Sequence, residues 1–209
     1  MGMYIRTKDI SAVQSRFIHL VNPSASTLVP SEKDDLKRRL LDPSASTEIW
    51  ETLLREEGIR SVWRIVPSKN TDFAHLRDGW MNGIKRATAE VKQHITAGPA
   101  LTEYNDETFG LAIKGFRDMF TGGGKAPKGS TILMLREASG ALEVLFEDPR
   151  KKAGLESIGK VEDPRIGRLV WLGYLAGKNV SSEPARKSVV DGYLAMAGRP
   201  VGSVETMVR

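Results

Sequence analysis

The apolar positions of this chain recur at helical spacing in its middle third. Between Asp72 and about Ala97 they form one stripe, made of Phe73, Leu76, Trp80, Ile84, Ala87, Val91 and Ile95. This spacing predicts a long amphipathic helix, for which Thr71 can act as the N-terminal cap. A second helix is predicted from Asn105 to about Phe120, where phenylalanine and isoleucine residues fall on one face.

Other segments have patterns that predict strands. Apolar side chains occupy both faces of Ile59–Pro67, which predicts a strand that is covered on at least one side. The apolar segments Ser130–Glu137 and Ala141–Asp148 are separated by three residues that end in glycine, which predicts a hairpin. The segment Met3–Ile5 is typical of a further strand.

Helices are also predicted towards both ends of the chain. Their N-terminal caps are predicted at Asp9, at Ser46 or Thr47, at Asp163, and at Ser181 or Ser182. The result is a few antiparallel strands with helices grouped apart from them. This arrangement defines an α+β fold and not an alternating βαβ fold.

The composition excludes several classes of function. The chain has 209 residues, and no apolar run approaches the roughly 20 residues that span a bilayer. The absence of cysteine excludes disulfides, thiol nucleophiles and cysteine-bound metal centres. The net charge of +5 is spread along the chain among acidic residues, so no nucleic-acid partner is predicted.

Motifs for catalysis are weak. The glycine-rich segment 121–131 lacks the residue order of a phosphate-binding loop and leads into a strand. The three histidines, His19, His75 and His94, do not have the spacing of metal ligands, so neither a metal nor a cofactor is predicted. The polar start of the long helix, with His75 and Asp78, fits a capped structural helix better than the alternative, an active site. The apolar stripe of that helix carries almost no polar group.

Four segments carry a family resemblance. They are GMYIRTKDI at the start, WRIVPSKNTDFAHLRDGW at 63–80, PKGSTILMLREASGALEVLFED at 127–148 and VEDPRIGRLVWLGYLAGKNVSSEPARKSVVDG at 161–192. Together, and in this order, they resemble the chalcone isomerase superfamily, with its fungal mitochondrial branch as the best match. The resemblance implies an open-faced β-sandwich, which is an antiparallel sheet with a layer of helices on one side. It also implies a ligand cleft between sheet and helices.

The resemblance further implies where the chemistry of the plant enzymes, which cyclise chalcones to flavanones, would lie. Their catalytic tyrosine falls on Phe73, their asparagine on Trp80 and their threonine near Tyr174. The arginine and threonine that hold the substrate oxyanion match positions upstream of this sequence. An electrophile for the developing enolate is therefore missing. Arg64 is the one cation at a corresponding position of the cleft, and Arg77 is a further candidate.

Three functions follow from these implications. The first is a non-catalytic protein that binds a fatty acid or another lipid in the cleft, through Arg64, Phe73, Arg77, Trp80 and Tyr174. The second is an isomerase of the intramolecular lyase class, in which Tyr174 is the acid and Arg64 the oxyanion partner. The third is a scaffold without a ligand.

The resemblance also implies a location and a domain organisation. We expect residues 1–209 to form one chalcone-isomerase-like domain that lacks N-terminal strands of the family. We expect a mitochondrial location, with membrane contact only through a missing upstream segment. An unpaired sheet edge at Met1–Arg6 would predict self-association, while the oligomeric state itself stays open.

Overall fold

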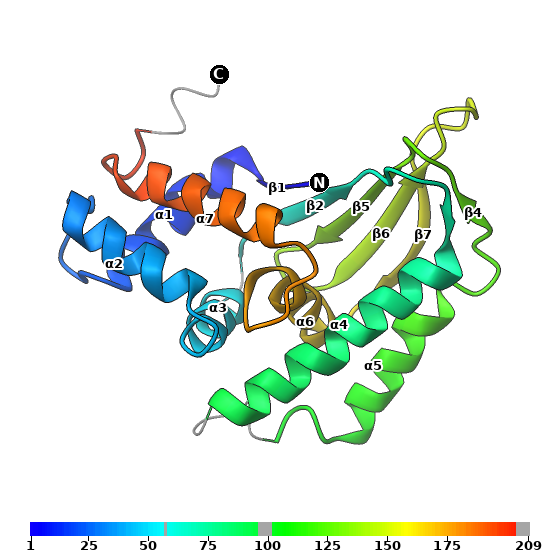
Figure 1. The fold of residues 1–209 in the computed structure, drawn as a ribbon, viewed down its shortest axis with the longest axis horizontal. Helices are drawn as coiled ribbons and strands as arrows, with labels where there is room; N and C mark the ends of the chain where they lie inside the picture. Colours follow the sequence, from blue (N-terminus) through cyan, green and yellow to red (C-terminus); the bar gives the residue numbers. More distant parts are fainter. Residues whose placement is uncertain (57, 96–101, 204–209) are drawn as a thin grey trace.

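The computed structural model of the protein describes residues 1–56, 58–95 and 102–203. Its main sheet has five antiparallel strands in the order β1-β2-β5-β6-β7, so that β1 forms one edge (Figure 1). The strands are β1 (Gly2–Ile5), β2 (Ser61–Ile65), β5 (Thr131–Arg136), β6 (Leu142–Glu147) and β7 (Glu156–Val161). A separate ribbon pairs β3 (Thr71–Asp72) with β4 (Lys125–Ala126).

One face of the main sheet is buried and the other is more open. Along β5, Ile132, Met134 and Arg136 are buried, while the residues between them are half-buried. The same alternation occurs in β6, and the register pairs Met134 with Val144. Because side chains alternate between the two faces of a strand, the buried sets of both strands point to one side.

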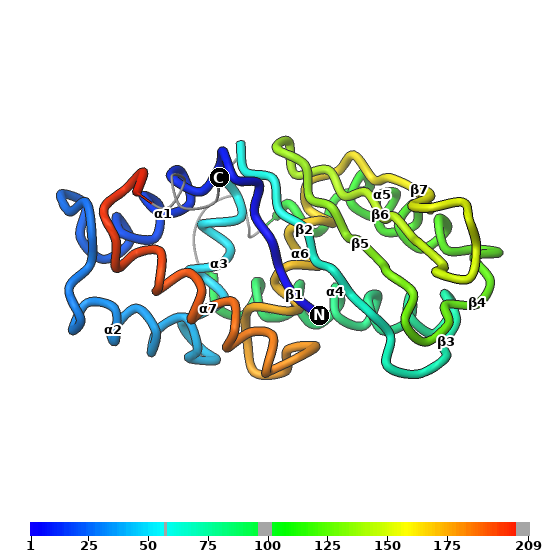
Figure 2. The backbone as a smooth tube through the Cα atoms, turned by 90° about the horizontal axis from the view of Figure 1, so that it is seen from above, coloured from blue at the N-terminus to red at the C-terminus, as the bar shows by residue number. Residues whose placement is uncertain are grey.

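The helices form two groups. The first group lies on the buried side of the sheet and contains α4 (Phe73–His94), α5 (Glu107–Asp118) and α6 (Pro164–Leu175). The second group lies beside the sheet and contains the 3-10 turn η1 (Thr7–Asp9), α1 (Ile10–His19), α2 (Pro30–Leu41), α3 (Ser46–Arg55) and α7 (Glu183–Ala197). Helix α6 packs on α4, α3, α7 and β6, and therefore connects the two groups. Figure 2 shows α7 next to the edge strand β1.

These elements confirm the α+β class, the strand at the N-terminus and the predicted hairpin. Gly140 ends the hairpin turn with φ of 88°, a conformation that glycine adopts without strain. Strand β7 was not predicted, because Glu156–Val161 contains few apolar residues and shows no clear alternation. Its residues are held in place by pairing with β6 rather than by their own pattern.

Some of the predicted helix caps are confirmed. Asp163 caps α6 and accepts a hydrogen bond from the backbone N–H of Arg165. Ser182 caps α7 in the same way through the N–H of Ala185. Asp9 lies at the cap position of α1, but its carboxylate accepts hydrogen bonds from Arg6 and does not cap the helix.

Two predicted caps are wrong because the side chain or the backbone of the residue is hydrogen-bonded to a distant segment instead. Thr71 belongs to the ribbon strand β3, and the side chain of Asp72 caps α4 instead. Ser46 is the first residue of α3, and its hydroxyl accepts a hydrogen bond from the N–H of Gly177. Helix α4 ends at His94, and the predicted end near Ala97 lies outside the described residues.

The buried core runs through both helix groups and the inner face of the sheet. Its largest fully buried side chains include Trp50, Trp63, Trp171, Phe73 and Phe116. Across the described ranges, no helix is both long enough and apolar enough to cross a bilayer.

Candidate functional site

Phe73, Trp80 and Tyr174, which the resemblance places at or near the catalytic positions of the family, come together beneath the sheet. They are only 1%, 7% and 4% exposed, with the first two on α4 and the third on α6. The indole Nε1 of Trp80 donates a hydrogen bond of 3.0 Å to the hydroxyl oxygen of Tyr174. The ring of Trp63, on the inner face of β2, lies 4.8 Å from the ring of Tyr174. These side chains form a packed aromatic cluster.

Phe73 closes the other end of this cluster. Its ring meets Phe146 edge-on at 4.9 Å and stacks on Phe120 at 6.2 Å. The glycine-rich segment covers it from outside, since a Cβ on Gly123 would lie 2.9 Å from the Cβ of Phe73. Glycine is therefore needed at this contact, which gives the segment a packing role.

The hydroxyl of Tyr174 is a neutral group at physiological pH. Burial raises the pKa of Tyr174 to about 12, and the hydrogen bond from Trp80 offsets only part of this rise. The phenol oxygen accepts its hydrogen bond from another neutral side chain. Whether Phe73, Trp80 and Tyr174 contact a ligand stays a prediction.

The predicted position of Arg64 in the cleft is wrong. Trp63 and Ile65 are buried on the inner face of β2, while Arg64 between them is exposed on the opposite face. The sequence did not determine which face of this strand is buried, because both faces carry apolar residues. Arg77 also lies away from the cluster, where it is partly exposed and forms an ion pair of 2.8 Å with the neighbouring Asp78.

An apolar groove lies at the sheet edge, between β1 and α7. It has a volume of about 440 Å³. Its lining includes Met3, Ile5, Ile10, Val189, Tyr193 and Met196. This volume is within the range of small-molecule sites, roughly 300–1,000 Å³. Met3 and Tyr193 also line a neighbouring pocket of about 30 Å³, which reaches inward to Arg136.

Arg136 is a buried cation that sequence reasoning missed. It is 4% exposed, and one of its terminal nitrogens donates to the backbone oxygen of Leu54. Burial lowers the pKa of Arg136 to about 10, which still leaves it charged at neutral pH. One signal was present in the sequence, since Arg136 falls on the same alternating set of β5 as Ile132 and Met134.

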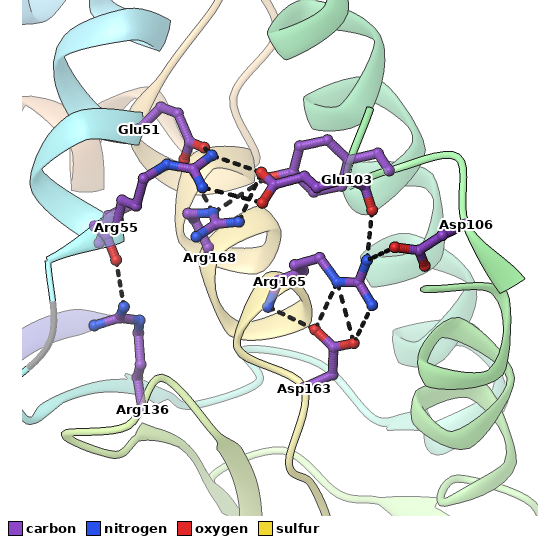
Figure 3. A network of polar contacts seen from close by, with 10 residues as sticks. Glu51, Arg55, Glu103, Asp106, Arg136, Asp163, Arg165 and Arg168 are labelled. Carbon is purple, nitrogen blue, oxygen red and sulfur yellow. Dashed lines mark hydrogen bonds and ion pairs between the residues drawn. The ribbon is translucent and has the colours of Figure 1, made fainter. Parts of the chain in front are cut away.

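A second buried arginine, Arg168 on α6, forms ion pairs with two carboxylates (Figure 3). Its guanidinium lies 3.1 Å from Glu51 and 2.9 Å from Glu103. Arg55 binds the same two carboxylates, at 2.6 Å in the case of Glu103. Burial raises the pKa of Glu51, and the neighbouring arginines offset part of the rise. These residues form an ion-pair network that links α3, α6 and the segment before α5.

The network continues to Arg165, on the solvent side. Arg165 lies 2.6 Å from Asp163 and 2.8 Å from Asp106. A polar pocket of about 510 Å³ opens beside these groups. Three of its lining arginines, Arg55, Arg165 and Arg168, pair with its carboxylates. Arg136 also lines this pocket, and within the described ranges it has no carboxylate at ion-pair distance. Within the described ranges, no group of three or more histidine and acidic side chains is arranged to hold a metal ion.

The sheet, its single buried face and the helices on that face define an open-faced α+β sandwich. A family profile described as chalcone isomerase like matches residues 1–190. The chain therefore belongs to the chalcone isomerase-like family.

Curated fungal relatives are similar over most of this chain. The protein named "Altered inheritance of mitochondria protein 18, mitochondrial" is 32% identical in Debaryomyces hansenii, over 94% of this chain and 60% of the relative. The protein of the same name in Kluyveromyces lactis is 30% identical, over 94% of this chain and 56% of the relative. The chain thus spans less than two thirds of these relatives. Their names support the mitochondrial location that the resemblance implies.

A solved structure with a similar fold is that of a fatty-acid binding protein from Arabidopsis thaliana. The TM-score is 0.58, and the match covers 93% of this chain and 77% of the other. The sequence identity is 18%, so the likeness concerns the fold. It confirms the chalcone isomerase type of architecture.

Proposed function

We propose that this chain is a non-catalytic member of the chalcone isomerase-like family that binds a fatty acid or another lipid. The observation that carries the proposal is the aromatic cluster at the family's catalytic positions. Phe73 has no hydroxyl to orient a substrate, and Trp80 uses its one polar hydrogen on Tyr174. A lipid needs apolar surface and few polar contacts, which suits a protein with these replacements.

Two further points support a lipid ligand. The groove between β1 and α7 has a largely apolar lining, and its volume suits a small ligand. The Arabidopsis protein with a similar fold is described as a fatty-acid binding protein. We propose the groove as the place of the apolar chain, with residues 1–209 acting as one domain.

The isomerase alternative has less support. It requires Tyr174 to act as an acid and Arg64 to stabilise an oxyanion beside it. Tyr174 packs against Trp63 on the inner face of β2, whereas the next residue, Arg64, is exposed on the other face. The two side chains point to opposite sides of the strand and cannot act on one substrate.

Native mass spectrometry of the purified chain tests the proposal. We expect the protein to bind added laurate and to retain lipid from the expression host, with no cyclisation of chalcone above the uncatalysed rate. Chalcone turnover that depends on the protein would contradict the non-catalytic assignment. If the chain binds neither laurate nor dodecanol at micromolar concentrations, the proposal of lipid binding is contradicted.

A further inference from the structure

Arg136 differs from its charged neighbours in its unused hydrogen-bonding capacity. Among the residues that the structure describes, its buried Nε–H has no acceptor and its guanidinium has no carboxylate at ion-pair distance. A buried cation is normally paired, because an unpaired one loses its hydration without compensation. In Figure 3, Arg136 lies apart from the ion pairs, and the dashed line from its guanidinium leads to a backbone oxygen, that of Leu54.

The electrostatic surroundings leave Arg136 short of negative charge. The charged groups that act on it include the cations Arg16 and Arg168 and the carboxylate of Glu51. That carboxylate is already bound by Arg168 and Arg55. The hydroxyl of Tyr193 lies near enough to interact, but burial raises its pKa and keeps it neutral. An added anion would therefore be stabilised here.

The pocket next to Arg136 has a mostly apolar lining with a few polar residues, among them Arg16, which forms an ion pair with Glu56. Its lining includes Val13, Phe17, Trp50 and Leu53. The indole N–H of Trp50 is a second buried donor without an acceptor in the described ranges. A volume of about 30 Å³ holds about two water-sized groups, which is the size of a carboxylate.

This pocket lies next to the apolar groove, since Met3 and Tyr193 line both. Met3 is half-buried on the edge strand β1, and its unbranched side chain can adapt to a ligand. An amphipathic molecule could thus extend from Arg136 past these two side chains into the groove.

We propose that Arg136 binds the carboxylate of a long-chain fatty acid whose acyl chain lies in the groove between β1 and α7. This inference rests on the proposed lipid-binding function and adds the position and charge of the head group. It replaces Arg64, the cation expected from the sequence, by an arginine on the inner face of the neighbouring strand.

The test compares laurate with dodecanol, which has the same chain length and no charge, by isothermal titration to the wild-type chain and to Arg136→Met. We expect the substitution to weaken laurate about tenfold or more and to leave dodecanol within about twofold, because only laurate has a charge-assisted bond to lose. Arg117→Met, at an exposed site on α5, is the matched control and should bind both ligands like the wild type.

A second variant tests the groove without touching the arginine. Gly192 lies on α7 in the groove lining, and a side chain there meets no protein atom within 4 Å. Gly192→Leu should therefore fold, fill the groove and weaken both ligands about tenfold. Gly110→Leu, at an equally open position on α5, is the control and should weaken neither.

The outcomes separate the two proposals. If Arg136→Met binds laurate as tightly as the wild type does, the head-group assignment is overturned and lipid binding stands. If Gly192→Leu leaves both affinities unchanged, the assignment of the acyl chain to the groove is overturned, even if Arg136→Met fails to fold. If the wild type binds neither ligand, the proposed function itself fails.

Discussion

Arg136 and Arg168 are buried arginines that lie in neighbouring regions and have opposite surroundings. Both are 4% exposed. Arg168 contacts Glu51, Glu103 and the hydroxyl of Tyr104, whereas Arg136 donates to one backbone oxygen, that of Leu54. A buried charge surrounded by partners serves to hold elements together. A buried charge with unused donors beside an apolar pocket has the properties of a ligand site.

The largest effect is expected from removing the paired arginine. Arg168→Met leaves Glu51 buried with a weakened set of partners, so we expect it to lower the free energy of unfolding by about 3–5 kcal/mol. Urea denaturation followed by circular dichroism measures this change. A loss below about 1 kcal/mol would show that the network does not hold α3 to α6.

The same substitution at Arg136 should behave differently in the absence of a ligand. Arg136→Met removes a charge that burial disfavours, together with one hydrogen bond. We therefore expect the free energy of unfolding to change by less than about 1 kcal/mol or to rise. Denaturation of both variants under identical conditions gives the comparison directly. An equal, large loss for both would mean that Arg136 has a structural partner.

The aromatic cluster gives a smaller effect than Arg168→Met does. Trp80→Phe leaves the buried hydroxyl of Tyr174 without its donor, and we expect a loss of about 1–3 kcal/mol. Tyr174→Phe leaves the indole N–H without an acceptor, at a similar cost. The double variant should lose less than the sum of the two, and additivity in this cycle would show that the hydrogen bond does not contribute.

The smallest effect concerns the exposed end of the network and depends on pH. Hydrogen bonds from the Phe109 N–H, the Thr108 hydroxyl and Arg165 lower the pKa of Asp106 to about 2. A carboxyl with a depressed pKa in the folded state stabilises the protein above its unfolded pKa, and this contribution is lost as the pH falls towards about 2. Asp106→Asn should therefore be less stable than the wild type at pH 7 and equally stable near pH 2. A difference that does not change with pH would contradict the ionic explanation.

Much of the fold could be predicted from the sequence because it is encoded locally. The stripe on α4 and the alternation in β5 and β6 each arise from neighbouring residues. Strand β7 could not be predicted, since its pairing partner and not its own pattern determines its conformation. The prediction of Thr71 as a cap was wrong for the same reason, because its backbone pairs with the ribbon strand β4.

The candidate site was less predictable than the fold. The family resemblance located Phe73, Trp80 and Tyr174, but their mutual packing depends on contacts over long sequence separations. Arg64 was assigned to the wrong face because both faces of its strand carry apolar residues. Arg136 could have been found from its place in the buried set of β5. That no carboxylate of the described residues pairs with it could not have been predicted, because pairing among arginines and acids depends on the tertiary structure.

The most direct test of the central claim is the titration of laurate labelled with carbon-13 at its carboxyl group, bound to the protein. A carboxylate beside an unpaired buried cation has a lowered pKa. We predict that in carbon-13 NMR spectra the bound carboxyl of the wild-type complex titrates at lower pH than free laurate, and that Arg136→Met removes this difference. The same titration curve in both proteins would contradict the assignment of Arg136 as the head-group site.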